Sequence, residues 1–337
     1  MKKISIVILN WNGEQLLKRF LPSVIRYSPT SLAEIIVADN ASTDASVAML
    51  EQEFPSVSII KLTHNYGFAE GYNQALAQIQ TPYVVLLNSD VEVTDHWLEA
   101  PLALLEKETK VACIQPKIRA WREKDKFEYA GAAGGFIDRF GYPYCRGRMF
   151  NTVEIDKGQY DQPIDVLWTT GACLFTRTAL YKTVGGLDSD FFAHQEEIDF
   201  CWRVRSRGYR LVCTPASTVY HVGGATLKTN NPRKTFLNFR NSLLMLYKNT
   251  PTAQLSFVMR VRFILDYVAL LQFILTGKIC EAKAVWKARQ AFHILKPSFK
   301  TKRIENLKHR TLLSIPEIKS SSLVISYYLK GKKHFSD

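Results

Sequence analysis

The feature that most constrains the fold is a regular alternation of strand and helix patterns over the first ninety residues. Short apolar runs alternate there with segments whose apolar residues recur at helical spacing. The strand patterns cover residues 4–9, 34–38, 57–62 and 83–87, and the helix patterns cover about residues 16–24, 45–53 and 71–80. Such alternation is typical of α/β proteins. The sequence therefore predicts an α/β fold with a mostly parallel sheet flanked by helices.

Polar residues stand at or just past the end of each predicted strand. They are Asn10, Asp39, Asn65 and Asp90. The carboxyl ends of parallel strands meet at one edge of a sheet, where ligands of open α/β sheets bind. A carboxylate such as Asp90 can hold a hard divalent cation, Mg²⁺ or Mn²⁺, that also binds substrate phosphates. The alternative is that residues 88–90 form only a turn, since Asn, Ser and Asp favour turns.

Two common nucleotide-binding motifs are absent from the sequence. Neither the dinucleotide fingerprint GxGxxG nor the phosphate loop GxxxxGK[ST] follows the first strand, which argues against a nicotinamide enzyme or an ordinary NTPase. Asp39 could accept a hydrogen bond from a pyrimidine base or a ribose hydroxyl, or it could cap a helix together with residues 42–44. Asn65, Gly67 and Gly71 could form a tight turn, or they could allow a nucleotide to approach the backbone closely.

Four segments, in this order, carry a resemblance to a known family. They read VILNWNG, VADNASTD, HNYGFAEGYNQAL and LLNSDVEV. The set resembles family 2 inverting glycosyltransferases of the Rossmann-like GT-A fold, with the rhamnosyltransferase-like branch as the nearest match, over roughly residues 3–245. The resemblance implies a nucleotide-sugar donor and a nucleotide pocket that includes Asn10, Trp11, Asn12 and Asp39. It also implies an NxD form of the DxD metal motif at Asn88, Ser89 and Asp90, with one carboxylate in place of two.

Three acids occupy the start of a predicted helix at residues 196–207. They are Glu196, Glu197 and Asp199. Acids in a first turn favour the helix dipole, and Asp199 can pair with Arg203. Inverting transfer also needs a base to take the proton of the acceptor hydroxyl. The stretch resembles the family's ED motif, which puts the base at Glu197, followed in our ranking by Asp199 and then Glu196.

The middle of the chain gives weaker signals. We expect strands at residues 111–118 and 166–175, and a polar, Gly-rich, irregular segment at residues 119–165. Trp168 could stack on a sugar ring or pack in the core. His221 is either a loop histidine or, as its resemblance to a family HxGGA(S/T) motif implies, a ligand of the metal or diphosphate. Arg240 could contact the donor diphosphate or be a surface charge.

Charge is distributed unevenly along the chain. Residues 1–227 hold 23 Lys and Arg against 26 Asp and Glu, whereas residues 228–337 hold 21 against 5. The tail carries helix patterns from residue 252 and at residues 279–295, with basic residues beside aliphatic and aromatic ones. We therefore expect a GT-A domain at residues 1–245 and a basic amphipathic helical region at residues 246–337 that attaches to an anionic membrane surface. The alternative is a helical subdomain that packs on the sheet domain.

These features together predict a glycosyltransferase. Its donor would be a dTDP- or UDP-sugar, with rhamnose as a candidate, and its acceptor a glycan or polyprenyl-linked glycan in cell-surface polysaccharide synthesis. Six cysteines lack metal-site spacing and no signal peptide is evident, so we expect a cytoplasmic protein on the inner face of the cytoplasmic membrane. The alternatives are a nucleotide-sugar-binding protein without catalysis and a basic nucleic-acid-binding protein, although no nucleic-acid motif is present.

Overall fold

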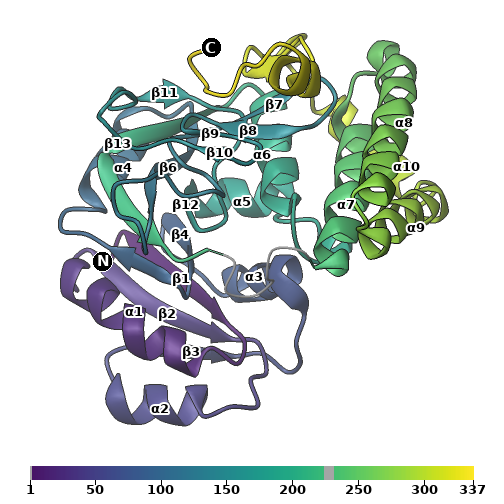
Figure 1. Cartoon of the computed structure of the whole chain (residues 1–337). Coiled ribbons are helices and arrows are strands. Elements are labelled where there is room, and N and C mark those ends of the chain that lie inside the picture. Colours follow the sequence, from purple (N-terminus) through teal and green to yellow (C-terminus); the bar gives the residue numbers. More distant parts are fainter. Residues whose placement is uncertain (1, 224–230) are drawn as a thin grey trace.

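The computed structural model describes residues 2–223 and 231–337 (Figure 1). Its first ninety residues follow the predicted alternation. The elements are β1 (Ile4–Asn10), α1 (Glu14–Tyr27), β2 (Ala33–Asp39), α2 (Ser46–Glu53), β3 (Ser58–Lys61), α3 (Gly67–Ala77) and β4 (Tyr83–Asn88). Strands β1, β2, β3 and β4 pair in parallel, in the order β3-β2-β1-β4, which confirms the α/β prediction.

Helices cover both faces of this parallel sheet because alternate strand residues point to opposite faces. On β1, Ile6 and Ile8 pack in one hydrophobic core with Leu17 of α1. Val7 faces the other way and packs in a second core with Tyr72 of α3. The apolar runs in the sequence are therefore buried on both faces.

The sheet continues beyond β4 with mixed strand directions. The added strands are β5 (Val91–Val93), β6 (Val111–Ala120), β11 (Ile164–Asp165), β12 (Cys173–Arg177) and β13 (Arg210–His221). The order is β11-β13-β6-β12-β4-β1-β2-β3, with β5 paired to β13. Strand β12 is antiparallel to both β4 and β6. The strand expected at residues 166–175 begins only at Cys173, and residues 166–172 form a turn-rich approach to it.

Residues 119–165, expected to be irregular, supply most of a second small sheet. Its strands are β7 (Gly135–Asp138), β8 (Pro143–Cys145), β9 (Arg148–Met149), β10 (Thr152–Val153) and β14 (Ile318–Lys319). The last of these comes from the tail and pairs in parallel with β7. Trp168 packs against Gly135 and donates to the Phe136 carbonyl at 2.9 Å, with 3% of its surface exposed. Trp168 is thus a core residue and does not face a sugar site.

Helices fill the remaining chain. They are α4 (Glu99–Lys107), α5 (Thr178–Val184), α6 (Glu196–Ser206), α7 (Pro232–Asn249), α8 (Thr252–Leu275), α9 (Ile279–Leu295) and α10 (Phe299–Lys308). Figure 1 shows α7 to α10 grouped at one side of the sheets, with α6 between them and β12. The expected domain boundary at residues 245 and 246 falls inside α7. In the described part of the chain, no helix combines the length and the apolar character that crossing a bilayer requires.

Candidate active site

The ends of β1 and β2 bring Asn10 and Asp39 into contact. The Asn10 side-chain amide donates to Asp39 Oδ1 at 3.1 Å, and the Ser42 backbone amide donates to Asp39 Oδ2 at 3.0 Å. Both side chains are almost fully buried. Asn10 Oδ1 is buried without a hydrogen-bond partner in the described chain, so it remains an acceptor for a ligand beside Asp39. Trp11, which follows at once, is 52% exposed.

The loop after β1 is tied to the loop after β2. Asn12, whose φ is 52°, accepts a hydrogen bond from the Thr43 backbone amide at 2.7 Å, and its own backbone amide donates to Ser42 Oγ at 2.9 Å. Ser42 and Thr43 therefore join two loops and do not cap α2, contrary to one sequence-based alternative. The N-cap residue of α2 is Ala45, and Asp44 before it accepts a hydrogen bond from the Ser46 backbone amide at 3.1 Å.

Asn40, which the sequence analysis missed, fixes the predicted turn at Asn65. Its amide nitrogen donates to Asn65 Oδ1 and to the Gly67 carbonyl, each at 3.0 Å, and its Oδ1 accepts from the Tyr66 backbone amide at 2.9 Å. A Cβ on Gly71 would lie 3.1 Å from Asn40 Nδ2, so that glycine allows close packing. The position of Asn40 at the end of the second strand was the signal that could have identified it.

The two predicted metal ligands are adjacent. Asp90 Oδ1 lies 3.1 Å from His221 Nε2, and Asn88 Nδ2 lies 3.5 Å from the same ring nitrogen. Burial acts to raise the pKa of Asp90, but hydrogen bonding and charge from His221 outweigh it and lower the pKa. Burial acts to lower the pKa of His221, whereas the charge of Glu128 and the hydrogen bond to Asp90 raise it to about 10. Asp90 is therefore ionised and His221 is protonated in the absence of a cation, so the two charges offset each other at the end of β4.

Glu128 extends this cluster and was not predicted. Its Oε1 lies 3.5 Å from His221 Nδ1, while Asp90 is at the other ring nitrogen. The backbone amide of Ala130 donates to its Oε2, and the side chain is buried. A Cβ on Gly223 would lie only 2.6 Å from Glu128 Oε1. Nothing in the irregular pattern of residues 119–165 distinguished Glu128 from the other acids there.

Asp90 and His221 fit a hard cation that is shared with a bound ligand. Within residues 2–223 and 231–337, no group of three or more His, Cys, Asp and Glu side chains is arranged to hold a metal alone. Mg²⁺ is usually bound by one or two carboxylates together with waters and substrate phosphates, and imidazole also suits transition metals. One carboxylate beside one imidazole at a strand end matches that pattern. Residues 224–226 of the HxGGA(S/T) motif lie outside the described residues.

The start of α6 is strained and rich in unpaired polar atoms. Phe192, His194 and Gln195 all have positive φ, at 64°, 69° and 74°. Four buried atoms have no hydrogen-bond partner in the part of the chain that the structure covers: His194 Nε2, Gln195 Oε1, Glu196 Oε2 and Glu197 Oε2. Strained backbone and orphaned polar groups together are typical of a ligand site.

Glu197 and Glu196 differ in exposure. Glu196 is buried, whereas Glu197 remains partly exposed. Burial raises the pKa of Glu197 to about 6. Burial, together with the charge of Glu197, also raises the pKa of Glu196. Glu197 is therefore the acid of this pair with access to a ligand and a pKa near neutrality, as a general base requires.

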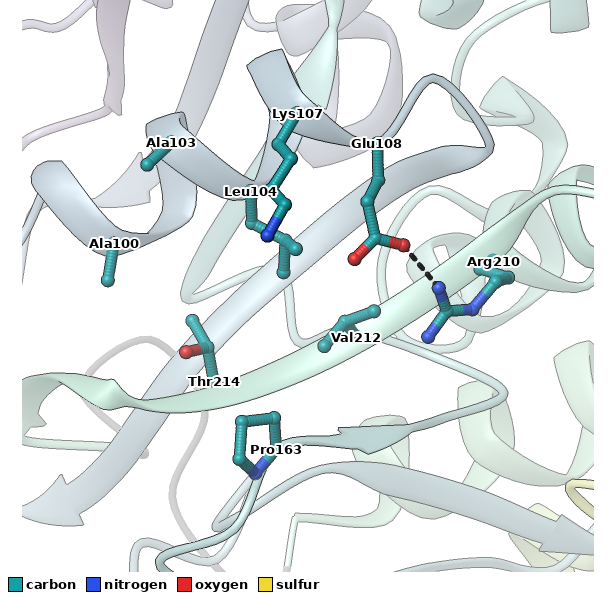
Figure 2. Close-up of a pocket in the computed structure, with 9 residues that line it drawn as sticks. All are labelled: Ala100, Ala103, Leu104, Lys107, Glu108, Pro163, Arg210, Val212 and Thr214. Atoms are coloured by element: carbon teal, nitrogen blue, oxygen red, sulfur yellow. Dashed lines mark hydrogen bonds and ion pairs between the residues drawn. The ribbon is translucent and has the colours of Figure 1, made fainter.

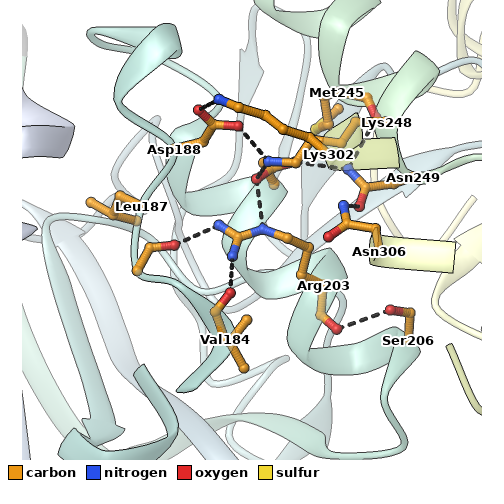
Figure 3. Close-up of polar contacts among 12 residues, drawn as sticks. Val184, Leu187, Asp188, Arg203, Ser206, Met245, Lys248, Asn249, Lys302 and Asn306 are labelled. Atoms are coloured by element: carbon orange, nitrogen blue, oxygen red, sulfur yellow. Dashed lines mark hydrogen bonds and ion pairs between the residues drawn. The ribbon is translucent and has the colours of Figure 1, made fainter. Parts of the chain in front are cut away.

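Asp199, the second-ranked candidate base, is placed where it cannot take that role. Its fully buried carboxylate pairs with Lys248 at 2.8 Å and Arg203 at 2.9 Å, and it accepts a hydrogen bond from Asn249 at 2.8 Å. Figure 3 shows how Lys248 continues the network to Asp188. Because both oxygens are engaged, Asp199 has a structural role.

Arg240 on α7 holds the segment that precedes the acids. Its guanidinium donates to the carbonyls of Asp190 at 3.1 Å and Phe191 at 3.0 Å. The neighbouring Asn241 also donates to Phe191 and to His194. Arg240 therefore positions the strained turn, and its contact with a donor diphosphate stays a prediction.

Short contacts connect the separate parts of the site. The Asn88 backbone amide donates to the Ala172 carbonyl at 3.0 Å, and a Cβ on the next residue back, Gly171, would lie 4.0 Å from Glu197 Cβ. The metal end and the acid end are therefore neighbours through this turn.

The loop after β1, where we expect the nucleotide, lies close to the predicted metal ligands, and the start of α3 lies close to the turn before the acids. A Cβ on Gly13 would lie 2.4 Å from Asn10 Oδ1 and 3.9 Å from Ser89 Oγ. A Cβ on Gly67 would lie 2.8 Å from the Phe192 ring, at the strained turn. The predicted residues at the strand ends and at the start of α6 thus gather at one edge of the sheet.

A separate cavity of about 380 Å³ lies elsewhere in the fold, between α4 and β13 (Figure 2). Its wall includes Leu104, Val212 and the ion pair between Glu108 and Arg210 at 2.5 Å. None of the predicted site residues lines it. Its lining also lacks a convergent set of polar groups, so we do not assign it a function.

Comparison with known proteins identifies the family. Residues 5–158 match the family model for glycosyl transferase family 2. The matched region, a little under half of the chain, is that of a family 2 glycosyltransferase. An N-acetylglucosaminyl-diphospho-decaprenol L-rhamnosyltransferase of Mycobacterium tuberculosis is 24% identical over 236 residues, which cover 65% of this chain and 75% of that protein. A low-salt glycan biosynthesis hexosyltransferase of Haloferax volcanii is 22% identical over 247 residues, which cover 72% and 74%.

Solved structures support a GT-A fold for this chain. TarS 1-349 of S. aureus in complex with UDP-GlcNAc superposes with a TM-score of 0.56 and 16% identity, over 92% of this chain and 89% of that one. GalNAc-T7 with UDP, GalNAc and Mn²⁺ gives a TM-score of 0.58 and 16% identity, over 74% and 48%. At these identities the likeness concerns the fold.

Proposed function

We propose that this family 2 glycosyltransferase moves a sugar, with inversion, from a nucleoside diphosphate sugar to a hydroxyl of a glycan or polyprenyl-linked glycan. The observation that carries the proposal is that the segments bearing Asp39, Asp90 and Glu197 are linked by short contacts between their neighbouring residues at one sheet edge. An activated sugar needs groups for its base, its diphosphate and its reacting carbon in that spatial order. The relative that acts on a decaprenol-linked substrate supports the lipid-linked acceptor, and polysaccharide synthesis is the pathway class we propose.

The nucleotide binds at the ends of β1 and β2. Asn10 and Asp39 offer a buried acceptor pair to a base N–H or a ribose hydroxyl, and Trp11 offers an exposed ring. Asn65, Gly67 and Gly71 bring the backbone of α3 close to the same edge. UDP- and dTDP-sugars, including a rhamnose donor, are the preferred candidates because a pyrimidine N3–H matches the carboxylate acceptor.

The diphosphate lies at Asn88, Ser89 and Asp90, where Asp90 and His221 hold Mg²⁺ or Mn²⁺. When bound, the cation neutralises the charge of the departing nucleoside diphosphate. Mn²⁺ in solved structures of the same fold supports this choice. Glu128 lies at the far side of the His221 ring and keeps the imidazole turned toward the strand end.

Glu197 accepts the proton of the acceptor hydroxyl as that hydroxyl attacks the anomeric carbon from the face opposite the diphosphate. Its partial exposure gives the acceptor access, and its pKa of about 6 leaves it charged at neutral pH. Burial and then the charge of Glu197 raise the pKa of the neighbouring Glu196, which favours its neutral form. Gly171 leaves room beside Glu197 for the acceptor.

The tail brings the enzyme to the inner face of the cytoplasmic membrane, where a polyprenyl-linked acceptor would be found. Its excess of Lys and Arg supports attraction to anionic lipids. We retain residues 1–245 as the transferase region and residues 246–337 as the membrane-attached helical region, although α7 belongs physically to both.

The direct test is a donor screen by thermal shift with UDP-, dTDP- and GDP-sugars, with and without Mn²⁺. A ligand that binds the native state raises the melting temperature. Transfer is then assayed with the donor that binds, using wild type and Glu197→Gln. Donor binding without transfer by the wild type, over a range of acceptors, would favour the second candidate, a nucleotide-sugar-binding protein without catalysis. Absence of any nucleotide-dependent shift would refute the proposed function.

A further inference from the structure

Helix α8 buries charged side chains and exposes apolar ones, which is the reverse of an ordinary surface helix. Its buried residues are Val258, Arg262 and Asp266, so its inward face carries two charges. Asp266 pairs with Arg262 at 3.0 Å and with Arg289 of α9 at 2.6 Å. A surface helix of a water-soluble domain normally turns its apolar stripe inward and its charges outward.

The outward face of α8 is apolar instead. Its exposed large residues include Phe257, Ile264, Val268, Leu271 and Leu275. Their spacing of seven, four, three and four residues puts them on one side of the helix. Ile264 is 61% exposed and Leu275 is 78% exposed. A stripe of this length in contact with water is unfavourable, and it indicates an apolar surrounding.

Helix α9 adds an aromatic and basic border to this stripe. Trp286 is exposed and meets the Tyr267 ring of α8 edge-on, with centroids 6.3 Å apart. Lys283 and Lys287 lie within one turn of Trp286 and are exposed. Aromatic rings together with Lys side chains beside an aliphatic face are typical of helices at a membrane interface.

A groove of about 710 Å³ opens beside the same two helices and α7. Ile264 and Phe263 line its apolar part, and the exposed Arg260 and Lys296 lie among its lining residues. Cations at the border of an apolar groove suit a phosphate group that is attached to a hydrocarbon chain. The groove and the stripe share Ile264, so they form one continuous surface.

From these features we propose that the α8–α9 face, meaning the outward stripe of α8 with Trp286, Lys283 and Lys287, docks the protein on an anionic phospholipid leaflet. Helix α8 lies in the plane of the interface, and lipid headgroup phosphates reach Arg260 and Lys296. This docking proposal rests on the proposed function only for its biological role, which is to bring the enzyme to a lipid-linked acceptor.

Charge and apolar character distinguish an anionic leaflet from the two other partners that could cover the α8–α9 face, a second copy of the chain and a nucleic acid. Residues 228–337 hold 21 basic and 5 acidic residues, so a second copy would bring like charge against like charge. A nucleic acid would match the charge, but its phosphate backbone offers no apolar partner for Ile264, Val268 and Leu271. An anionic leaflet matches both the charge and the stripe.

The test is flotation of the full chain with vesicles of phosphatidylcholine alone and of phosphatidylcholine mixed with phosphatidylglycerol, without any donor. We expect binding to the anionic vesicles only, and a loss of about tenfold or more in the Ile264→Ser/Leu271→Ser variant because both side chains would leave the acyl region. The control is Leu313→Ser, which changes a leucine that is 96% exposed outside this face. Lys283→Gln/Lys287→Gln should bind more weakly and lose part of the salt dependence.

Several outcomes would overturn the proposal. One is failure of wild type to float with anionic vesicles, and another is equal loss in the Leu313→Ser control. A third is a wild-type dimer in light scattering that the Ile264→Ser/Leu271→Ser variant converts to a monomer, which would give the face to a second copy. Transfer to a water-soluble acceptor should be the same in wild type and the face variant. Failure of docking is thereby distinguished from failure of the proposed function.

Discussion

Lys248 of α7 lies 2.8 Å from Asp199 of α6, and this contact joins the helical tail to the helix that carries the candidate base. The Lys248 ammonium also lies 2.6 Å from Asp188, which precedes the strained turn at residues 192–195. All three side chains are buried, and Figure 3 shows Lys248 beside Asp188. The helices after residue 231 therefore contribute to the geometry of the candidate site, because Lys248 of α7 holds residues of α6 and of the segment before the strained turn.

Replacing Lys248 with Met should destabilise the protein strongly. The substitution keeps an unbranched chain but leaves Asp188 and Asp199 without a buried cation, which costs roughly 3–5 kcal/mol of unfolding free energy for a broken buried pair. Urea unfolding of the variant measures this loss. Lys302→Met is the matched control, since Lys302 also pairs with Asp188 but is 35% exposed. Equal losses in the two variants would contradict the importance of burial at Lys248.

Glu197→Gln should abolish transfer while donor binding persists. Removing a general base lowers kcat by about 10²- to 10⁴-fold, and the amide keeps the size of the side chain. Steady-state transfer and donor-induced thermal shift are measured together on the same preparation. Glu196→Gln is the comparison, and we expect a smaller loss from it because Glu196 is buried. A Glu197→Gln enzyme with wild-type kcat would show that the base lies elsewhere.

The pH profile gives an independent test of Glu197. Burial raises its pKa to about 6, so the charged form that accepts a proton is depleted below that pH. We expect kcat/KM to fall about tenfold per unit as the pH drops below 6. Because the pKa of Glu197 is higher in the folded than in the unfolded protein, its protonated form stabilises the fold. This contribution is complete at pH values below the pKa in the unfolded protein, and it is lost as the pH rises through 6. Glu197→Gln should therefore melt at a higher temperature than wild type at pH 8, and a lower melting temperature would contradict this account.

The sequence predicted where β2 and β4 end because the relevant signals are local. Asp39 and Asp90 stand where apolar runs stop, and parallel pairing brings such positions together. Glu128 was missed because its role comes from a contact with His221, which is far away in the chain. No spacing rule reports such contacts.

The burial of Asp199 follows from helical geometry. Positions 196 and 199 are three apart on a helix and share a face, while position 197 lies on another. Helical periodicity thus puts Asp199 with the buried Glu196 and separates both from Glu197. The structure adds the reason that a charge is tolerated there, namely Lys248 and Arg203.

Glu128→Gln should weaken metal binding without touching a metal ligand. Glu128 Oε1 lies 3.5 Å from His221 Nδ1, and loss of its charge frees the imidazole to turn away from Asp90. Carboxylates that orient a ligating His contribute about 10- to 100-fold in affinity. Titration with Mn²⁺ followed by electron paramagnetic resonance measures the Kd directly. Glu123→Gln, at an exposed acid of the same segment, is the control.

The Mn²⁺ titration tests separately whether the cation site exists and whether Glu128 orients His221. If wild type binds Mn²⁺ and Glu128→Gln binds it equally well, Glu128 has no orienting role. If wild type does not bind Mn²⁺, with or without a nucleotide, the cation site at Asp90 and His221 is wrong. Binding that is lost in Asp90→Asn but merely weakened in Glu128→Gln is the expected pattern.

Alanine substitutions at Gly67 and Gly185 can be compared to distinguish backbone strain from a steric effect on the site. Both have positive φ, at 76° and 90°, so an alanine costs each position about 1–2 kcal/mol. A Cβ on Gly67 would also lie 2.8 Å from the Phe192 ring, whereas a Cβ on Gly185 would meet no described atom within 4 Å. We expect Gly67→Ala to lose at least as much unfolding free energy as Gly185→Ala, because it adds the contact with Phe192 to the same backbone strain.

Only Gly67→Ala should lose transfer, because the displaced Phe192 ring belongs to the turn that carries the candidate base. Adding Phe192→Ala to Gly67→Ala removes the clash and should restore kcat to the level of Phe192→Ala alone. Steady-state kinetics on the three variants, each checked by urea unfolding, measures this recovery. Equal kcat in Gly67→Ala and wild type would mean that the contact between α3 and the turn does not set the geometry of Glu197.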